Sequence, residues 1–485
     1  MNKHSNTQKV LKGVSSQTMV TLMLGVVELL SFSIMSRLLT KADFGYYAAI
    51  TGIVAVFASF SETGIGSAIV QCKDLTKRYV NNAFTLSLII GFVISFLLFS
   101  LSGVIAGSVA DDSMIFPLKL MSITLLLHCM TSVFASLMHR RLEFFRMGLI
   151  RLFSLIVTTV VAVILAYEGY GYYAIITKAV LESVLTFLLF FYFCKTGFGI
   201  MLDKQTSSSI FKFSGWLMAS VLFRNLSHQI DKLLMPKLLS IESLGAYNRP
   251  KNFIEQISSK LNGIFDIALF PVLSSIQDEK EKLARAFRQS LSIMNMFAML
   301  LTLTFVFNSQ LIIRIFFGEK WMNLNTVTII LAFVLIFNID GRLSDCYLRS
   351  LGMTKQQFYF RIFETILNIS GVLMGCYWGV VGVAVAIVIT NSVAKLLKVV
   401  YIANKIEIGC CDTLRIILNS WRFAIILVPI CFFAENILPN SLIGNVVMGI
   451  LFVIVVSLIF FFFPHFVGKD YKANIYTKLI KKIKG

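Results

Sequence analysis

The chain has 485 residues, of which 57% are hydrophobic and 14% charged, and its mean hydropathy is +0.80. This composition excludes a soluble globular protein, which would expose too much apolar surface, and it indicates an integral membrane protein. A formal charge of +19 would suggest nucleic acid as the partner of a soluble protein. Here the basic residues lie mostly between apolar runs, so membrane topology accounts for them and no nucleic acid is expected.

The chain begins with a basic segment, 1–12, and the apolar run after it is too long for a removable signal peptide, so we predict a first transmembrane helix there. Apolar runs of about 20 residues recur along the chain and predict an all-α integral membrane protein with about fourteen transmembrane helices. The predicted spans are residues 14–36, 44–70, 81–107, 115–138, 147–167, 170–194, 210–235, 244–272, 287–307, 325–350, 358–378, 380–404, 416–434 and 441–463.

The distribution of lysine and arginine sets the topology. An even number of spans places both termini on one side, and with a cytoplasmic N-terminus the cytoplasmic stretches are rich in basic residues while the opposite loops are poor. The basic residues assigned to cytoplasmic stretches are those of the two termini and Lys73, Lys77, Arg78, Arg140, Arg141, Arg146, Lys195, Lys204, Lys280, Lys282, Arg285, Arg288, Lys395, Lys398 and Lys405. We therefore predict cytoplasmic termini, with the basic tail close to anionic membrane lipids.

The sequence contains an internal repeat. Residues 37–47 align with residues 237–247 at a spacing of 200 residues, and both stretches fall at a junction between two predicted helices. Parallel repeats are related by an axis along the membrane normal and place the substrate path at their interface. We therefore predict two six-helix lobes related by a pseudo-two-fold axis, followed by two additional helices. The predicted domains are 1–195, 196–405, 406–464 and the basic cytoplasmic tail 465–485.

The seventh and eighth predicted spans carry more charge than a lipid-facing helix tolerates. On a helix that turns by about 100° per residue, Arg224, His228 and Asp231 fall within roughly 60° of one another. In the eighth span the apolar residues gather on one arc, and Lys251 and Lys260 lie on the other half. A span that is apolar on one side and charged on the other is typical of the wall of a wet cavity.

The charged residues of this region suggest two roles. Cations outnumber acids there, so the cavity needs an anion, and the candidate substrate-binding residues are Arg224, Arg249, Lys251, Lys260, Asn262 and Arg342. The alternative is that such residues form ion pairs which lock the helices, for instance Asp231 with Lys260 or Asp340 with Arg342. The candidates for coupling to a proton or sodium ion are Glu62, His228 and Asp231. A packing role remains the alternative for His228.

No catalytic, cofactor or metal motif is found in the sequence. It lacks a Walker loop and a dinucleotide glycine pattern, and its eight cysteines have no zinc or redox spacing. Asp111 and Asp112 on an outer loop could represent the acid pair of a membrane glycosyltransferase, but no large outer loop accompanies them, so we interpret them as a solvated turn. The sequence thus favours a transporter over an enzyme.

Several stretches together resemble the Wzx-type polysaccharide flippases of the multidrug/oligosaccharidyl-lipid/polysaccharide exporter superfamily. Within that family the chain looks most like the colanic-acid type lipopolysaccharide exporters, from the first helix to about Lys405. The stretches that carry the resemblance are 36–39, 43–45, Glu62 with Gly64, 69–71, 231–233, 245–248, 270–278 and 317–321.

The resemblance implies a two-lobed helical bundle in the bacterial cytoplasmic membrane. Such a protein moves an undecaprenyl-pyrophosphate-linked oligosaccharide to the outer leaflet by alternating access, for lipopolysaccharide, capsule or exopolysaccharide synthesis, beside polymerase and export machinery. The cationic face, with Arg224 and Lys260, would hold the pyrophosphate. The alternatives are a cation-coupled drug exporter, which would favour an acidic cavity, and a membrane glycan polymerase or glycosyltransferase.

Overall fold

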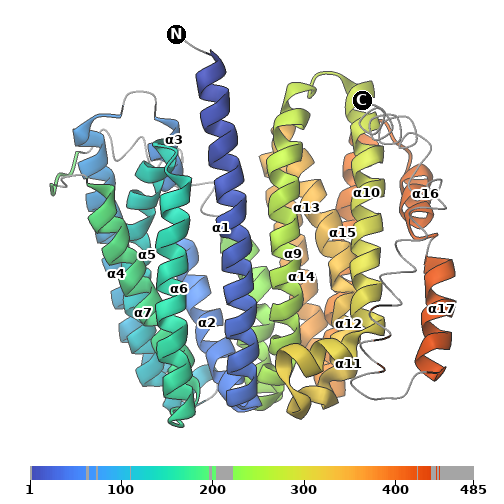
Figure 1. Cartoon of the computed structure of the whole chain (residues 1–485), viewed down its shortest axis with the longest axis horizontal. Coiled ribbons are helices and arrows are strands. Elements are labelled where there is room, and N and C mark those ends of the chain that lie inside the picture. Colours follow the sequence, from blue (N-terminus) through green and yellow to red (C-terminus); the bar gives the residue numbers. More distant parts are fainter. Residues whose placement is uncertain are drawn as a thin grey trace. The chain divides into compact units, whose positions relative to one another are not determined.

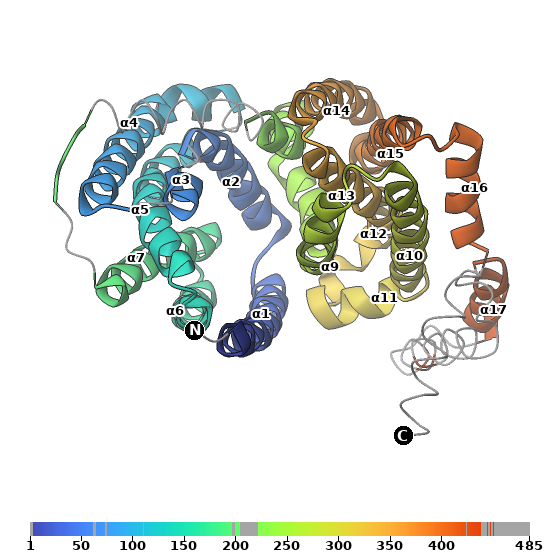
Figure 2. The same cartoon turned by 90° about the horizontal axis from the view of Figure 1, so that it is seen from above.

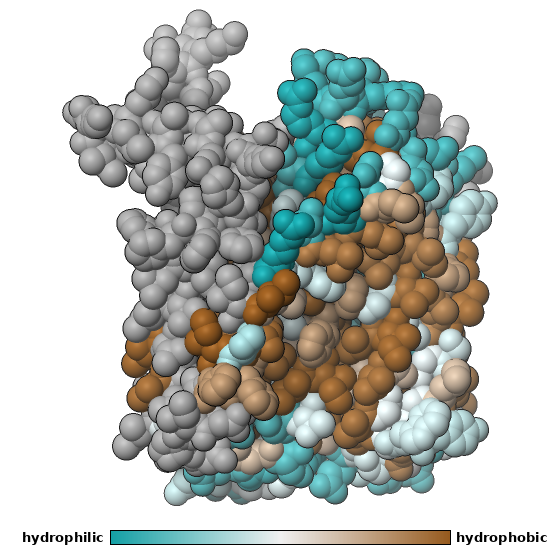
Figure 3. All heavy atoms as spheres, turned by 90° about the vertical axis from the view of Figure 1, so that its right-hand side faces the viewer, coloured by the Kyte–Doolittle hydropathy of each residue, from teal (hydrophilic) through white to brown (hydrophobic). Residues whose placement is uncertain are grey.

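The computed structural model describes residues 3–61, 65–72, 75–109, 111–195, 199–203, 222–422 and 424–437, together with 444, 447 and 450. Every regular element in these ranges is a helix. Nine helical stretches of the described chain are long and apolar enough to cross a membrane. Figure 3 shows the matching surface, where an apolar band lies between two polar rims on the coloured part of the face. The chain is thus an all-helical, multi-pass membrane protein.

The chain divides into two compact units, Met1–Asn248 and Arg249–Gly485, and the boundary falls inside one long helix. The first unit is built around α5, which packs against α4, α7, α3 and α2 (Figure 1). Its helices are α1 (Lys3–Leu38), α2 (Lys41–Ser61), α3 (Ile65–Gln71), α4 (Lys77–Val109), η1 (Asp112–Met114), α5 (Ile115–Arg140), α6 (Phe144–Tyr167), α7 (Tyr172–Cys194) and the helical segment 222–238.

The second unit is organised around α13 (Val334–Ser350), most of whose side chains are buried. Helix α13 packs against α15, α10 and α14 and lies inside the group of helices that forms this unit (Figure 2). The other elements are α9 (Ile241–Ser275), α10 (Lys280–Phe307), α11 (Ser309–Ile312), η2 (Ile313–Phe317), η3 (Glu319–Leu324), α12 (Asn325–Ala332), α14 (Thr354–Gly375), η4 (Cys376–Trp378), α15 (Gly379–Lys405), α16 (Cys410–Ser420) and α17 (Ala424–Ile437).

Several predicted spans differ from the helices. The predicted span 416–434 is wrong as a single helix, because α16 ends at Ser420 and α17 starts at Ala424. Helix α16 is only 11 residues long, which is too short to cross a bilayer, and it is amphipathic, with a polar and an apolar face. The predicted span 44–70 includes α2 and α3, with residues 62–64 between them outside the described residues, and 441–463 lies almost wholly outside the described residues.

The two stretches matched by the repeat are helix-to-helix corners with the same capping chemistry. At the start of α2, the backbone N–H of Asp43 donates to Oγ1 of Thr40 over 3.2 Å. At the start of α9, the backbone N–H of Ser243 donates to Oγ of Ser240 over 3.0 Å. Each hydroxyl therefore satisfies an N–H of the first helical turn, which explains why both helices begin at this point.

The same two corners pack against each other inside the first unit, and their glycines make the contact. A Cβ on Gly45 would overlap the carbonyl oxygen of Ile241, and a Cβ on Gly245 would overlap that of Lys41. Gly45 matches Gly245, and Lys41 matches Ile241, at the spacing of the repeat. The contact is thus reciprocal, as expected where two copies meet across a local two-fold axis.

Substitution of either corner glycine should destabilise the protein. Gly45→Ala and Gly245→Ala are each expected to cost about 1–3 kcal/mol, because the added methyl group requires the facing backbone to move. Thermal unfolding of the purified protein in detergent would measure the loss. The matched control is Gly103→Ala in α4, where a Cβ meets nothing within 4 Å and the change should be neutral or slightly stabilising. Equal effects of all three substitutions would contradict the corner contact.

Candidate functional site

The predicted coupling residues His228 and Asp231 and the predicted substrate-binding residue Arg224, all in the segment 222–238, lie in different environments. Asp231 is buried, with 1% of its surface exposed, whereas His228 is exposed and Arg224 is half-buried. The segment packs on α2, where the side-chain amide of Asn225 donates to Oγ of Ser59 over 2.9 Å. The side chain of Lys232 lies against Gly52. The predicted polar face is therefore partly packed against protein, and Glu62 lies outside the described residues.

Helix α9 carries the predicted cations of the eighth span. Arg249 is buried, and Lys251 forms an ion pair of 3.8 Å with Glu255 one turn later. The side chains of Lys260 and Asn262 lie outside those that the structure describes. The roles of these residues in substrate binding stay predictions.

The second unit contains a buried ion quartet that we define as Asp345, Arg361, Glu364 and Lys398. Arg361 contacts both carboxylates, at 2.7 Å for Glu364 and in a closer contact for Asp345. The Nζ of Lys398 lies 3.1 Å from Asp345 and 3.0 Å from Glu364. Each charge thus has two partners of opposite sign, and the quartet joins α13, α14 and α15.

A second polar layer lies one helical turn from the quartet. Lys395 donates to the side-chain oxygen of Asn338, and its stem packs against Gly341 of α13. The amide of Asn295 on α10 donates to Oδ1 of Asp340 over 2.6 Å. The carboxylate of Glu255 lies within electrostatic reach of Lys395. Helix α9 therefore contributes a half-buried carboxylate that acts on this layer.

These buried charges correct one assignment made from the sequence. Lys395 and Lys398 were assigned to a cytoplasmic stretch, but both are buried inside α15, with Lys398 fully covered. The ion-pair alternative named for Asp340 is also revised, because its bond comes from Asn295 rather than from Arg342, which is half-buried on the same helix. The paired acid of α13 is Asp345.

Sequence analysis missed the quartet, although a signal was present. Arg361 and Glu364 are three residues apart on α14, and Lys395 and Lys398 are three apart on α15. On each helix this spacing places the two charges on one face. Because the quartet contains two cations and two acids, it has no excess positive charge to hold a substrate anion. Its arrangement suits a rigid structural element.

The first unit has a smaller polar cluster. Nζ of Lys178 on α7 donates to Oγ of Ser31 on α1 over 2.6 Å. Glu28 and Glu182 both lie within electrostatic reach of this region, and Thr159 of α6 donates to the same Ser31 oxygen over 3.3 Å. These contacts bring α1, α6 and α7 together at the hydroxyl of Ser31.

Asp111 has a structural role in the loop before η1. Its carboxylate accepts hydrogen bonds from the backbone N–H of Ser113 over 3.2 Å and from the hydroxyl of Tyr46 over 3.1 Å, which caps η1. These bonds, led by that from Ser113, lower the pKa of Asp111. Asp111 and Asp112 are both exposed, which supports the solvated turn, and an ionised Asp111 cannot serve as a general acid.

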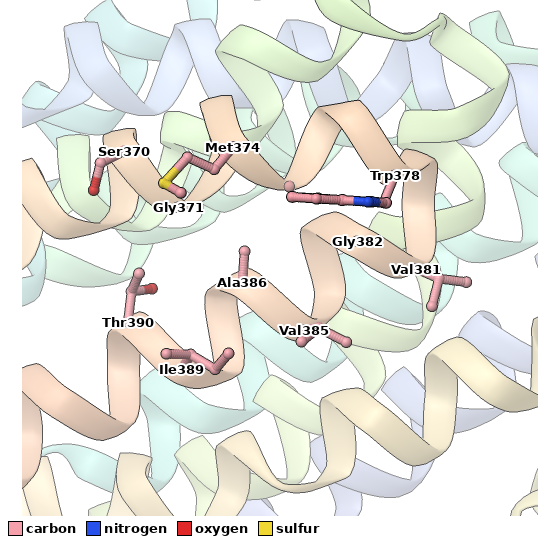
Figure 4. Close-up of a pocket in the computed structure, with 11 residues that line it drawn as sticks. Ser370, Gly371, Met374, Trp378, Val381, Gly382, Val385, Ala386, Ile389 and Thr390 are labelled. Carbon is pink, nitrogen blue, oxygen red and sulfur yellow. The ribbon is translucent and has the colours of Figure 1, made fainter.

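An apolar groove of about 460 Å³ lies between α14 and α15. Figure 4 shows Met374 and Trp378 on one side of it and Ala386, Ile389 and Thr390 on the other. Its lining contains no charged residue, so it cannot provide the anion site. Among the residues that the structure describes, no group of three or more histidine, cysteine, aspartate or glutamate side chains is arranged to hold a metal ion.

The chain is similar to known membrane proteins of polysaccharide synthesis. Residues 34–326 match the family model described as "Polysaccharide biosynthesis protein". The lipopolysaccharide biosynthesis protein WzxC of Escherichia coli K12 is 25% identical over 397 residues, which cover 81% of this chain and 80% of WzxC.

Two solved structures have a similar fold. The lipid II flippase MurJ in its inward closed conformation superposes with a TM-score of 0.72 at 16% identity, covering 92% of this chain and 98% of MurJ. An inward-facing multidrug resistance MATE family transporter of the MOP superfamily superposes with a TM-score of 0.64 at 15% identity, covering 81% of this chain and 94% of the transporter. At these identities the likeness concerns the fold.

Removal of one charge from the quartet should destabilise the second unit. Lys398→Met leaves Asp345 and Glu364 with Arg361 as the remaining quartet cation, and the loss of one partner from a buried ion cluster costs about 3–5 kcal/mol. Thermal unfolding in detergent would detect this loss. The matched control is Lys282→Met, since Lys282 forms an exposed ion pair of 2.6 Å with Glu279. That change should cost less than about 1 kcal/mol, and similar losses in both variants would contradict a stabilising quartet.

Proposed function

This chain belongs to the polysaccharide biosynthesis protein family, among the Wzx-type proteins of the MOP superfamily, and from this membership we propose that it is a flippase for lipid-linked oligosaccharides. The substrate would be an oligosaccharide repeat unit on undecaprenyl pyrophosphate, moved across the bacterial cytoplasmic membrane by alternating access. The product would serve lipopolysaccharide, capsule or exopolysaccharide synthesis. The observation that carries the proposal is the family match across residues 34–326.

The proposed architecture has about fourteen transmembrane helices in two six-helix lobes, 1–195 and 196–405, related by a pseudo-two-fold axis. Two further helices would follow within 406–464, and both termini would lie in the cytoplasm. The reciprocal contact of Gly45 and Gly245 supports this symmetry, because equivalent residues of the two corners face each other. The matched caps at Thr40 and Ser240 support it independently.

The proposed anion site uses cations that do not belong to the quartet. Its candidates are Arg224, Arg249, Lys251, Lys260 and Arg342, with Asn262 as a partner for sugar hydroxyl groups. Guanidinium and ammonium groups suit a pyrophosphate, the first through two parallel hydrogen bonds and the second as a point charge. The balance of charge within the quartet supports this choice, since its cations already have carboxylate partners.

The proposed coupling residues remain Glu62, His228 and Asp231, with a proton or sodium ion as the coupling ion. Asp231 is buried and its carboxylate accepts from the backbone N–H of Lys232 over 2.9 Å; its place in a membrane helix supports a role in coupling, because buried ionisable residues there commonly mark ion pathways. A drug exporter would share the fold, but the polysaccharide family match favours the flippase.

The decisive experiment on function is a deletion of the gene, followed by mass analysis of lipid-linked sugars. A flippase defect should leave undecaprenyl-pyrophosphate-linked repeat units in the inner leaflet and remove the surface polymer. Re-introduction of the intact gene should reverse both effects. Unchanged polymer and unchanged lipid-linked sugars in the deletion strain would overturn the proposed function.

The anion site is tested by a double replacement, Arg224→Gln with Lys260→Gln. We expect loss of polymer export while the protein still inserts in the membrane, because two cations of the proposed pyrophosphate site are removed. Export in a complemented deletion strain and protein level in membranes would be measured together. The matched control is Arg285→Gln with Arg288→Gln, which removes two exposed cations from α10 and should leave export intact. Normal polymer in the first double mutant would contradict this site.

A further inference from the structure

Asp340 has an unusual environment for a carboxylate. It lies in α13 with 0% of its surface exposed, and its Oδ1 accepts one hydrogen bond, from the side-chain amide of Asn295. Its Oδ2 is also buried and has no hydrogen-bond partner among the described residues. No ion pair joins it to a described cation either. The transport site proposed above does not use this residue.

The side-chain amide of Asn295, which faces Asp340, also contains an atom without a hydrogen-bond partner among the described residues. Nδ2 of Asn295 donates to the carbonyl oxygen of Leu291 over 3.0 Å as well as to Asp340 over 2.6 Å. Two acceptors around one atom identify that atom as the nitrogen, because an amide oxygen could donate to neither. Oδ1 of Asn295 is therefore the other amide atom, and it is buried without a partner.

A single proton would account for both orphan oxygen atoms. A protonated carboxyl group is an O–H donor as well as an acceptor, and a primary amide offers the complementary pair of groups. A proton on Oδ2 turns that atom into a donor, the kind of group that Oδ1 of Asn295 requires, while Oδ1 of Asp340 keeps its hydrogen bond from Nδ2. Without that proton, Oδ2 of Asp340 and Oδ1 of Asn295 are both acceptors, and no hydrogen bond can form between them.

Lys395 acts on Asp340 electrostatically but forms no ion pair with it, so it does not compensate the charge as a bound proton would. Nζ of Lys395 donates to Asn338, although its stem passes Gly341, the residue next to Asp340. Helix α10 contributes only neutral Asn295 here, since its charged residues lie between Lys280 and Arg288, about two turns away. The other charged groups of α13 are Arg342, Asp345 and Arg349. Those of the helices α14 and α15 that pack against it are Lys355, Arg361 and Glu364 of α14 and Lys398 and Lys405 of α15, and Glu255 of α9 acts on Lys395.

Asp345 of the same helix provides an internal comparison. It is equally enclosed, but it contacts both Arg361 and Lys398, so its negative charge is compensated. Asp340 has no cation of the described chain in contact with it, although the charge of Lys395 acts on it from a distance, and burial of a carboxylate without a contacting cation has a large free-energy cost. The two acids of α13 therefore require different protonation states: Asp345 is ionised, and Asp340 carries a proton.

We propose that Asp340 is a proton-binding site, occupied in this conformation and shared with Asn295, and that this proton is exchanged during transport. The exchange step rests on the flippase function proposed above. When the site opens, the proton passes to water and the carboxylate gains the ammonium group of Lys395, which leaves Asn338. Asp340 thus alternates between a neutral amide partner on α10 and a cationic partner on α15, and helix packing follows its protonation.

Proton binding is tested by infrared difference spectroscopy on the purified full-length protein in lipid nanodiscs. We expect a carbonyl band of a protonated carboxyl group at neutral pH that is absent from Asp340→Asn and retained in Asp345→Asn. Asn295→Leu should shift this band, because it removes the hydrogen-bond partner without removing the acid. The same band in wild type and Asp340→Asn would overturn the proposal.

Thermal unfolding separates this role from a structural one. Asp340→Asn replaces one neutral group with another and should keep the melting temperature of the wild type. Asp345→Asn breaks the ion quartet and should lower the melting temperature by several degrees. A comparable decrease in both variants would indicate that Asp340 is ionised and would contradict the proposal.

Exchange during transport is tested in the deletion strain. Asp340→Asn, which cannot release a proton, should lose most polymer export at normal protein level, whereas Asp340→Glu should retain export with a changed dependence on external pH. If the infrared band is present but Asp340→Asn exports normally, the exchange step is wrong. If deletion of the gene itself leaves lipid-linked sugars and polymer unchanged, the flippase function fails, while the spectroscopic result still decides proton binding.

Discussion

A charge inside a membrane-spanning bundle must be compensated within the protein, and this constraint organises the second unit. Asp345, Arg361, Glu364 and Lys398 come from three helices and form a closed set in which every charge has two opposite partners. Such a set gains little over apolar packing, but removal of any member is costly. The quartet thus fixes the relative register of α13, α14 and α15. The polar groups able to change their protonation state are therefore those outside the quartet.

Helix α13 shows how one element can combine both kinds of site. It lies inside its unit, so apolar residues such as Leu343 and polar residues such as Asp345 are equally enclosed. Asp345 faces cations on two neighbouring helices, whereas Asp340, five residues earlier, faces the neutral amide of Asn295. The position of each aspartate around the helix axis therefore determines its partners. Asp345 is held as a fixed negative charge, whereas Asp340 can bind and release a proton, although both have the same side chain.

The sequence was sufficient for the membrane class, most helices and the corner repeat, because hydropathy and short capping motifs are local properties. It also identified charge in 222–238 and α9, where several ionisable residues lie close together in the chain. It could not identify the quartet, since pairing of Asp345 with Arg361 and Lys398 depends on which helices become neighbours. The same limit assigned Lys395 to a cytoplasmic stretch, because a lysine near the end of an apolar run normally marks the membrane surface.

The two corners share their capping pattern, whereas the interiors of the two units differ. Close approach at Gly45 and Gly245 tolerates no side chain, so both positions are constrained by backbone geometry. The interiors are not constrained in this way: Lys178 of the first unit donates to a serine, and Lys395 of the second donates to an asparagine beside a buried acid. The corner contact therefore depends on backbone geometry, whereas the response of each unit to protons depends on its own buried charges, which differ between the two units.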